Sequence, residues 1–361
     1  MYEIDPSIRK ATTLPSDFYQ NPATWEAVRE RVFARSWLCL GDRDLMLRGP
    51  ENVVPRWLLE NYLDEPVLLV RDKEALHCLT NVCTHRGFLL AQHPTRARKL
   101  VCQYHGRKFA LDGTFESMPE FREAEDFPRP CDHLHRLPLE NWRQFLFTGV
   151  DPRHDFSTIR DRLDDKLGFL PIEDFVYRPE LSKTYNISAH WALYCDNYLE
   201  GFHIPFVHAT LGSLLDYGQY STDCFDGIVL QTGYAGDNDF IFDLPEGQPD
   251  FGKRVTAYYY WIFPNMMLNF YPWGLQTNIV RPVNSNFTKV EFEYYIYDAE
   301  MFELMNGAQV AEKTEREDEF VVEAVHRGLR SRFYKSGRFS PKREKGVHYF
   351  HQLLAQALSE G

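Results

Sequence analysis

The chain has 361 residues, of which 44% are hydrophobic and 15% aromatic, and its formal net charge at pH 7 is −12. This length predicts two domains, and the negative charge, together with the lack of a long basic run, argues against a nucleic-acid partner. No apolar run is long enough to span a membrane and no apolar leader stands at the start, so we expect a cytoplasmic protein without membrane contact.

The first elements in chain order are helical. Residues 16–38 carry polar and proline start signals, followed by apolar residues at helical spacing. From about residue 40 to 149, short runs such as PVLLVRD and WRQFLFTG alternate with Gly, Pro, Asn and Asp, as in a small all-β domain. Residues 149–167 begin with turn residues and continue as a charged helix, which is typical of a connection between domains.

The rest of the chain mixes helix and strand. Residues 181–188 predict a strand that leads into a helix, and residues 254–298 contain the Tyr-, Phe-, Val- and Ile-rich runs of an antiparallel sheet. Residues 308–330 return to helical periodicity. Within the sheet, the run YYYWIFPNMMLNFYPWG places aromatic side chains on both faces, where most form the core and some can line a pocket.

Two short motifs in the β domain each contain one cysteine and one histidine that can bind a metal. CTHRG contains Cys83 and His85, and CQYHG contains Cys102 and His105. Two thiolates and two imidazoles on paired loops can hold a zinc ion or an iron–sulfur cluster. Zinc fingers usually group their cysteines together and their histidines together, so one ligand of each kind per loop favours a [2Fe–2S] cluster. Gly87 and Gly106, which end the two motifs, suit tight loops.

The order Cys-x-His and then Cys-x-x-His resembles the signature of the Rieske non-heme iron oxygenases, the superfamily of ring-hydroxylating oxygenase α subunits. The resemblance implies that Cys83 and Cys102 bind one iron of the cluster, and that His85 and His105 bind the other. Respiratory Rieske proteins carry a further cysteine in each loop, which this chain lacks. Electron transport in a membrane is therefore disfavoured.

The segment DNYLEGFHIPFVH, residues 196–208, concentrates further ligands. A non-heme Fe(II) that activates oxygen needs two histidines and one carboxylate on one face, and His203 and His208 supply the histidines. On a helix, Asp196, Glu200 and His203 project to one side. Pro205 then disturbs the helix and turns His208 toward the same centre.

The third ligand is expected to be a carboxylate on the apolar face of a helix. In EREDEFVVEAVHRGL, Asp318 is followed at helical spacing by apolar residues, namely Val321, Val322, Val325 and Leu329. Glu319 instead aligns with Glu323 and His326 on a polar face, and Glu317 is borderline. Asp318 is therefore the preferred third ligand, and Glu200 is the alternative.

The resemblance extends to both of these segments. In the family, a segment of the type N-x-x-E/D-G-F/Y-H-x-x-x-x-H carries the iron, and this chain matches it through Asn197, Glu200, His203 and His208. The helix around Asp318 is similar to the one that supplies the third ligand. We therefore expect His203, His208 and Asp318 to hold the iron, with Asn197 and Glu200 as the catalytic residues beside it.

The resemblance also implies a role for Glu200 in electron transfer. As a bridge, Glu200 accepts a hydrogen bond from His203 and reaches the partner subunit's His105, which orients both imidazoles. This role requires an oligomer, and the resemblance implies a homotrimer in which the cluster of one chain lies next to the iron of another.

The source of electrons is expected to be a separate protein. Oxygen activation consumes two electrons beyond those of the Fe(II) alone, and the cluster delivers them singly. The sequence contains neither a G-x-G-x-x-G dinucleotide fingerprint nor the cysteine spacing of a plant-type ferredoxin. A flavin or iron–sulfur reductase, or a ferredoxin, is therefore expected to supply electrons from NAD(P)H.

The fold class implied by the resemblance is α+β. A small all-β Rieske [2Fe–2S] domain is expected at residues 39–150, and a catalytic mononuclear iron domain at residues 151–361, with helices covering an antiparallel sheet in a helix-grip arrangement. The N-terminal helical segment, residues 1–38, is expected to pack on the catalytic domain.

The aromatic run at residues 258–274 suits either a planar aromatic ring or a quaternary ammonium group. Arg107 stands where many aromatic-ring dioxygenases have tryptophan, and the tail GRFSPKREKGVHYFHQLL resembles the choline, glycine betaine and carnitine oxygenase branch. We expect a terminal oxygenase that uses O2 to oxidise a C–H bond next to a quaternary ammonium nitrogen, by N-demethylation or choline-type hydroxylation.

Two alternatives stay open at this point. One is an aromatic-ring hydroxylating α subunit that acts on a benzoate-like substrate. The other is a non-catalytic Rieske electron carrier or ligand-binding module. In the tail, His348 and His351 are expected to pack or to contact a subunit rather than to bind a third metal.

Overall fold

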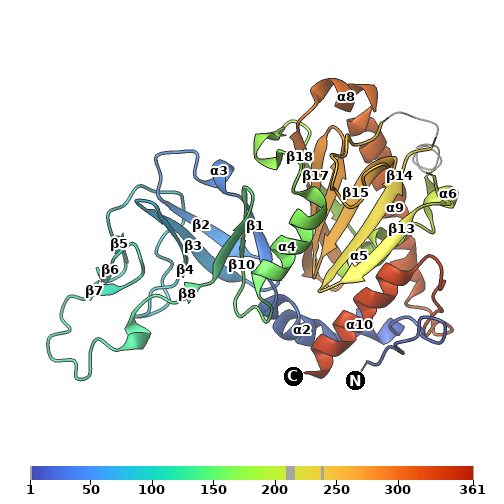
Figure 1. Cartoon of the computed structure of the whole chain (residues 1–361). Coiled ribbons are helices and arrows are strands. Elements are labelled where there is room, and N and C mark those ends of the chain that lie inside the picture. The colour runs from blue at the N-terminus through green and yellow to red at the C-terminus, as the bar shows by residue number, and fades with distance from the viewer. Residues whose placement is uncertain (1, 209–215, 237–239, 361) are drawn as a thin grey trace. The chain divides into compact units, whose positions relative to one another are not determined.

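The computed structural model describes residues 2–208, 216–236 and 240–360, which form two compact units (Figure 1). The small unit is Ala34–Arg153, and the large unit combines Met1–Phe33 with His154–Gly361. The boundaries expected from the sequence, 38/39 and 150/151, compare with 33/34 and 153/154 between these units. The N-terminal helical segment belongs to the large unit, which also contains the mixed sheet and helices.

The small unit, all of whose residues are described, consists of short antiparallel strands in three sheets. Their orders are β1-β10-β9, β2-β3-β4-β8 and β5-β6-β7. The strands are β1 (Leu38–Asp42), β2 (Val53–Leu58), β3 (Glu65–Asp72), β4 (Ala75–Thr80), β5 (Leu100–Val101), β6 (Lys108–Phe109), β7 (Phe115–Ser117), β8 (Arg136–Leu137), β9 (Leu139–Trp142) and β10 (Phe145–Thr148). A short helix α3 (Arg43–Met46) and a 3₁₀ turn η2 (Pro130–Asp132) complete the unit.

Alternating strand residues build the core of the small unit around the two cysteines of the paired motifs. Cys83 and Cys102 are only 1% and 2% exposed, and they pack in one cluster with residues such as Leu68, Leu79 and Phe109. Burial of these apolar side chains supplies the main favourable term for folding. The cysteines are thereby held within the packed core of the unit.

The large unit contains one antiparallel sheet, in which β11-β18-β17-β16-β15-β14-β13 are successive neighbours and β12 also pairs with β18. The prediction of an antiparallel sheet at residues 254–298 corresponds to four of its neighbouring strands, β15 to β18. The strands described in this unit are β11 (Val176–Tyr177), β12 (Lys183–Ile187), β13 (Ser221–Phe225), β14 (Ile228–Tyr234), β15 (Val255–Ile262), β16 (Met266–Tyr271), β17 (Gly274–Asn284) and β18 (Phe287–Ile296).

Helices cover this sheet, and α5 contacts both α9 and β17 on the face that lies behind the strands in Figure 1. None of the helices in the described part of the chain combines the length and apolar composition that a membrane crossing requires. The helices are α1 (Ser16–Gln20), α2 (Pro22–Arg31), α4 (Phe156–Leu167), α5 (Trp191–Tyr198), α6 (Ile204–Val207), α8 (Ala299–Leu304), α9 (Gly307–Gly328) and α10 (Lys345–Ser359), with 3₁₀ turns η1 (Phe33–Arg35) and η3 (Ile172–Asp174).

The sheet face under α9 carries polar groups where a simple core would carry aliphatic ones. One row of directly paired residues crosses five strands from β14 to β18, and it consists of Gln231, Tyr259, Asn269, Gln276 and Tyr294. All five side chains are buried. Buried polar groups without hydrogen-bond partners lower stability, so this row indicates a polar surface inside the unit with a role beyond core packing.

The segment 196–208 is not one helix. Helix α5 ends at Tyr198, the next residues are non-helical, and α6 begins at Ile204 with Pro205 in its first turn, where proline fits. Asp196 instead accepts a hydrogen bond from Tyr19 at 3.0 Å and lies 2.9 Å from His351 Nε2. The expectation that Asp196 projects to the same side as Glu200 and His203 is therefore wrong, because the helix stops between them.

The two histidines of the tail, His348 and His351, form hydrogen bonds inside the large unit. His351 is 1% exposed, accepts the Leu14 N–H on Nδ1 at 3.1 Å and contacts Asp196 through Nε2 at 2.9 Å. His348 Nε2 lies 2.8 Å from the Asp5 carbonyl oxygen. Both side chains thus fasten the N-terminal segment to α10, which agrees with packing rather than with metal binding.

His190 at the start of α5 predicts an acid-sensitive fold. Its side chain is 2% exposed, it accepts the Ala192 N–H on Nδ1 at 3.2 Å, and burial lowers its pKa from 6.5 to about 3. Between these pKa values only the unfolded chain takes up the proton, so stability falls as the pH drops below 6.5. We expect this group to contribute a loss of about 1.4 kcal/mol per pH unit down to about pH 3.

The control is His190→Asn, which keeps an N-cap acceptor and removes the titration. Urea unfolding of both proteins between pH 7.5 and pH 4.5 gives the comparison. The difference in unfolding free energy between wild type and variant should shrink steadily as the pH falls. Parallel pH profiles for the two proteins would show that His190 is not buried as the neutral form.

Candidate metal centres and cavity

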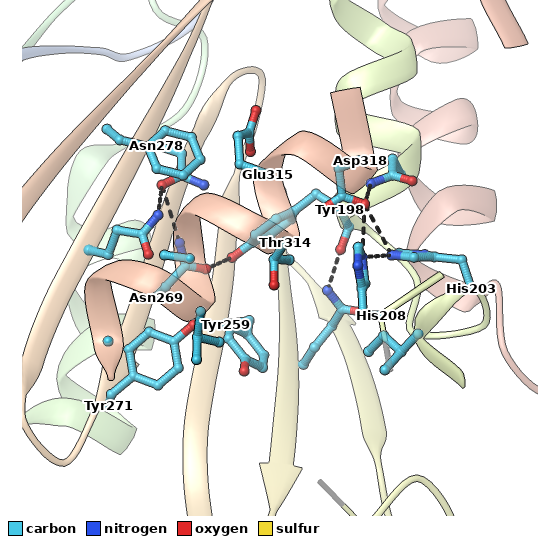
Figure 2. Close-up of a pocket in the computed structure, with 18 of the residues that line it drawn as sticks. Tyr198, His203, His208, Tyr259, Asn269, Tyr271, Asn278, Thr314, Glu315 and Asp318 are labelled. Carbon is cyan, nitrogen blue, oxygen red and sulfur yellow. Dashed lines mark hydrogen bonds and ion pairs between the residues drawn. The ribbon is translucent and has the colours of Figure 1, made fainter. Parts of the chain in front are cut away.

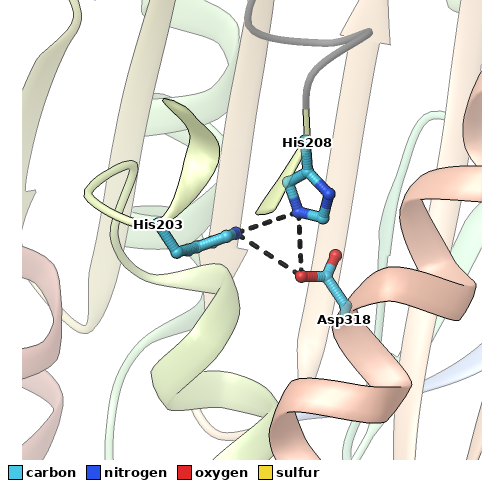
Figure 3. A group of neighbouring side chains, drawn as sticks. All are labelled: His203, His208 and Asp318. Carbon is cyan, nitrogen blue, oxygen red and sulfur yellow. Dashed lines mark hydrogen bonds and ion pairs between the residues drawn. The ribbon is translucent and has the colours of Figure 1, made fainter. Parts of the chain in front are cut away.

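Three side chains of the large unit converge with their metal-binding atoms (Figure 3). His203 and His208 flank α6, and Asp318 projects from α9. His208 Nε2 lies 3.1 Å from His203 Nε2 and 3.0 Å from Asp318 Oδ1, and His203 Nε2 lies 3.4 Å from the same oxygen. Among the described residues, these three form the only group of His, Cys, Asp and Glu with ligand atoms this close together.

Each histidine is oriented from behind by a carboxylate. Glu200 Oε1 lies 2.7 Å from His203 Nδ1, and Glu317 Oε2 lies 2.8 Å from His208 Nδ1. A carboxylate at Nδ1 holds the imidazole proton there, so that the Nε2 lone pair of each ring faces the centre. Glu200 therefore lies on the far side of His203 from the converging atoms, where it orients a ligand.

Sequence reasoning missed Glu317, which it treated as borderline. The signal was its position directly before Asp318 on α9, but only the fold shows that His208 lies next to it. The predicted apolar stripe after Asp318 also differs from the structure. Val322 and Leu329 are buried, whereas Val325 is 44% exposed and His326, assigned to the polar face, is buried.

Asn197 supports the carboxylate side of the centre. It occupies the last turn of α5, and its Nδ2 donates to Asp318 Oδ1 at 2.6 Å. Additional backbone contacts fix Glu200, whose Oε2 accepts the N–H groups of Phe202 and His203. The two residues expected beside the iron thus position Asp318 and His203.

The electrostatics of the centre favour a bound cation. Burial opposes protonation of His203, but the carboxylates of Asp318 and Glu200 outweigh it and raise the pKa of His203 to about 9. Burial likewise opposes protonation of His208, whose pKa is raised by Asp318 and Glu317. The Nε2 atoms of His203 and His208 and the Asp318 carboxylate face one another. A cation bound between them would offset the repulsion among their lone pairs. A two-histidine, one-carboxylate donor set fits Fe(II).

The paired cysteine–histidine loops of the small unit share one backbone pattern. In each loop the glycine four residues after the cysteine donates its N–H to the cysteine carbonyl, at 3.0 Å from Gly87 and 2.9 Å from Gly106. The N–H groups of Cys83 and Cys102 in turn donate to carbonyls five positions later, at 2.9 and 2.8 Å. Both glycines have positive φ, +73° and +75°, which favours glycine.

The four predicted ligands lie at the tips of these loops. The rings of His85 and His105 have centroids 4.8 Å apart, and His105 Nδ1 is a buried atom with no hydrogen-bond partner in the described structure. Burial raises the pKa of the Cys83 thiol, and the adjacent Cys102 adds to this effect. Two thiols and two imidazoles, one of them with an orphaned nitrogen, fit a cluster with mixed ligation.

A buried ion pair ties both loops together. Arg107 is 1% exposed and donates to Asp132 Oδ1 at 2.6 Å and to the Asp132 carbonyl at 3.2 Å. Thr84, in the first loop, donates to that same carbonyl at 2.9 Å. The guanidinium also lies over the rings of Phe115 and Phe127, at 4.8 and 5.4 Å from their centroids. Arg107 is therefore a structural residue of the cluster loops.

A cavity of about 160 Å³ opens between α9 and the sheet and reaches the three converging ligands (Figure 2). Tyr271 and Trp273 stack with centroids 4.9 Å apart, and Tyr259 meets Tyr271 edge-on at 5.7 Å. The aromatic residues that line the cavity are Tyr194, Tyr198, Tyr220, Tyr259, Tyr271, Trp273 and Phe292. Some of the aromatic run at 258–274 thus faces the cavity.

Buried amides form the other part of the cavity wall. Asn278 Oδ1 accepts from Gln276 at 3.0 Å and from Asn269 at 3.3 Å, and Asn269 Oδ1 accepts from the Tyr198 hydroxyl at 2.8 Å (Figure 2). Gln231 donates to the Tyr198 carbonyl at 2.7 Å. Sequence reasoning missed these residues, although polar side chains at alternate positions of apolar strands were the available signal.

The chain has the architecture of a Rieske non-heme iron oxygenase. One β unit carries the cluster ligands, and a second unit of sheet and helices carries the ligands of a mononuclear metal centre. Residues 176–360, more than half of the chain, match the family described as Ring hydroxylating alpha subunit (catalytic domain), and residues 51–128 match the Rieske [2Fe-2S] domain. The chain belongs to the ring hydroxylating alpha subunit family. The predicted family, fold class and enzyme class are confirmed.

Similar proteins extend over nearly the whole chain. Chloroplastic choline monooxygenase of Beta vulgaris is 28% identical over 99% of this chain and 80% of the relative. The carnitine monooxygenase oxygenase subunit of Escherichia coli (strain K12) is 28% identical over 98% of this chain and 95% of the relative.

Solved structures show the same fold. The quaternary ammonium Rieske monooxygenase CntA in complex with L-carnitine has a TM-score of 0.75 at 24% identity, covering 99% of both chains. Naphthalene 1,2-dioxygenase from Rhodococcus sp. has a TM-score of 0.70 at 16% identity, covering 97% of this chain and 95% of the other. The Rieske domain implies a [2Fe–2S] cluster, and the catalytic domain implies a mononuclear iron.

Proposed function

We propose that this chain is the terminal oxygenase component of a Rieske oxygenase system, and that it oxidises a C–H bond next to a quaternary ammonium nitrogen. Cys83, His85, Cys102 and His105 would hold the cluster. His203, His208 and Asp318 would hold the iron, which supplies O2 activation when bound. The observation that carries the proposal is the convergence of three ligand atoms at an aromatic cavity.

The substrate class rests on the cavity and on the relatives. Faces of tyrosine and tryptophan attract a quaternary ammonium group, and stacked rings such as Tyr271 and Trp273 offer such faces. The relatives named above are choline and carnitine monooxygenases. A benzoate-like substrate is disfavoured, because no lysine or arginine is among the described residues that line the cavity.

The protein residues have separate tasks in this reaction. Glu200 and Glu317 hold the imidazole protons on Nδ1, and Asn197 holds the Asp318 carboxylate in place. The aromatic wall binds the substrate and excludes water from the carbon that reacts. Preorganised ligands of this kind need no rearrangement when substrate arrives.

The overall reaction consumes substrate, O2, two electrons and two protons, and it forms a hydroxylated carbon and water. On an N-methyl carbon the product is a hemiaminal, whose C–N bond breaks to release a tertiary amine, formaldehyde and a proton. On the carbinol carbon of a choline-type substrate, the same insertion forms an aldehyde hydrate.

The partners belong to this proposal. Electrons would come from NAD(P)H through a flavin or iron–sulfur reductase, or a ferredoxin. We propose a homotrimer in which Glu200 links His203 to the partner subunit's His105. Glu200 already contacts His203 within one chain, which supports this role. A cytoplasmic location is part of the proposal, supported by seven cysteines that form no disulfide.

The test is substrate-triggered oxidation of the reduced cluster. Purified protein is assayed for iron, where about three irons per chain are expected for one cluster and one mononuclear site. The reduced enzyme is then mixed with O2 and choline, glycine betaine, carnitine or benzoate, while cluster absorbance and formaldehyde or aldehyde are followed. Fast oxidation with product from an ammonium compound supports the proposal. Acceleration by benzoate alone, or two irons per chain, would overturn it.

A further inference from the structure

Glu315 is the one carboxyl group of the described cavity wall that has no task at the metal centre. It projects from α9 one turn before Asp318, lines the cavity and is only 3% exposed (Figure 2). Its Oε2 accepts the Tyr194 hydroxyl at 2.7 Å. Its Oε1 is buried and has no hydrogen-bond partner in the part of the chain that the structure describes.

Such an atom needs an explanation, because a buried polar group without a hydrogen-bond partner is destabilising and rare in folded proteins. Protonation of Glu315 does not remove the cost, since a hydroxyl on Oε1 would lack an acceptor just as the bare oxygen lacks a donor. The charged groups that influence the pKa of Glu315 include Asp318, Glu319 and Arg316. Arg316 is bound to Glu319 and Glu312 on the solvent side of α9, so it does not occupy the cavity.

The other carboxylates of the cavity wall are already in use. Asp318 belongs to the three converging ligands, and Glu200 holds His203. No lysine or arginine is among the described lining residues. Glu315 is therefore a buried carboxyl group in an aromatic cavity whose described lining offers it no cationic partner. In such a buried place a carboxylate attracts a cation much more strongly than it does in water.

From this geometry we infer that Glu315 is the counter-charge for the substrate cation, and that the site selects substrates with a net positive charge over zwitterions. The inference rests on the proposed function and narrows its substrate class to ammonium compounds with a neutral polar end, such as an alcohol. The aromatic rings contact the methyl groups. Glu315 adds a full negative charge, which a neutral ring lacks.

The neutral end has its own partners. The amide groups of Asn269, Gln276 and Asn278 lie in the same wall and bear no charge. They can exchange hydrogen bonds with a hydroxyl group, whereas a carboxylate there would be buried without a cation, which is costly. Burial raises the pKa of Glu315 well above its usual value, so an arriving cation also stabilises the ionised carboxylate.

The direct test compares choline with 3,3-dimethyl-1-butanol. The second compound has nearly the shape of choline, but a carbon atom replaces the nitrogen, so it is neutral. Calorimetric titration of the iron-loaded holoenzyme gives a Kd for each compound and for glycine betaine. We expect wild type to bind choline at least about 10-fold more tightly than either. Glu315→Gln should lose most of this preference while its Kd for the neutral alcohol stays within about 3-fold.

The matched control is Glu319→Gln, which removes the same charge from the same helix but outside the cavity wall and should keep the preference. If wild type binds choline well and Glu315→Gln retains the full preference, the inference is wrong and the proposed function stands. If Glu315→Gln does not fold, the Kd values of the wild-type enzyme still test the inference. Equal wild-type Kd values for choline and the neutral alcohol would contradict a counter-charge in the cavity. If no ammonium compound binds wild type, the proposed function itself fails.

Discussion

Asp318→Ala is expected to remove turnover while the cluster spectrum stays intact. Loss of one of three protein ligands leaves only His203 and His208, whose Nε2 atoms alone cannot hold the metal against solvent. Loss of a mere hydrogen-bond partner of a ligand costs about 10- to 100-fold in metal affinity or activity, so loss of the ligand should exceed about 100-fold. Iron content should fall from about three to about two per chain.

The control for this experiment is Glu319→Ala, a carboxylate one position later on α9 that pairs with Arg316 at 2.8 Å. It should retain iron and turnover close to those of wild type. Activity that survives in Asp318→Ala with three irons per chain would contradict the assigned ligand. Loss of cluster absorbance in the same variant would show instead that the change damages the whole fold.

Arg107→Leu is expected to destabilise the small unit by about 3–5 kcal/mol, the usual cost of removing one partner from a buried ion pair. Asp132 would keep a buried carboxylate near the apolar core, since the pair has side chains only 2% and 10% exposed. The measurement is urea unfolding of the holoenzyme followed by cluster absorbance. The double variant Arg107→Leu/Asp132→Asn should recover part of the loss, because it removes the charge left behind.

An exposed pair of the same unit gives the comparison. Arg136 and Asp112 lie 2.7 Å apart with side chains 54% and 38% exposed. Arg136→Leu should therefore cost less than about 1 kcal/mol, as for exposed ion pairs generally. Equal urea midpoints for the Arg107 and Arg136 variants would mean that the buried pair does not hold the loops together.

The paired motifs show what the spacing of residues along a chain can indicate. Cys83, His85, Cys102 and His105 lie in two short motifs, and the structure brings them together through nearly identical turns. The antiparallel sheet was also predictable, because the alternation of side chains across a strand leaves a local pattern. In both cases the relevant information lies within a few consecutive residues.

Contacts between distant segments could not be predicted in this way. Glu317 orients His208 from 109 positions away, and only the path of α9 across the sheet decides which carboxylate of EREDE meets which histidine. The end of α5 at Tyr198 was missed because the residues after it have ordinary helical propensity except for Gly201 and Pro205. The polar sheet row depends on strand register, which forms only when five strands pair.

Helix α9 places three carboxyl groups within one turn, and each has a different orientation: Glu315 in the cavity wall, Glu317 behind His208 and Asp318 among the ligands. A shift of this helix by even one residue would exchange all three positions at once. New substrate preferences can therefore arise by replacing side chains on the helix, but not by moving it. The opposite wall, made of strands β14–β18, carries none of the metal ligands, so its side chains can change without loss of the metal. Variation among enzymes of this build should therefore concentrate on the sheet.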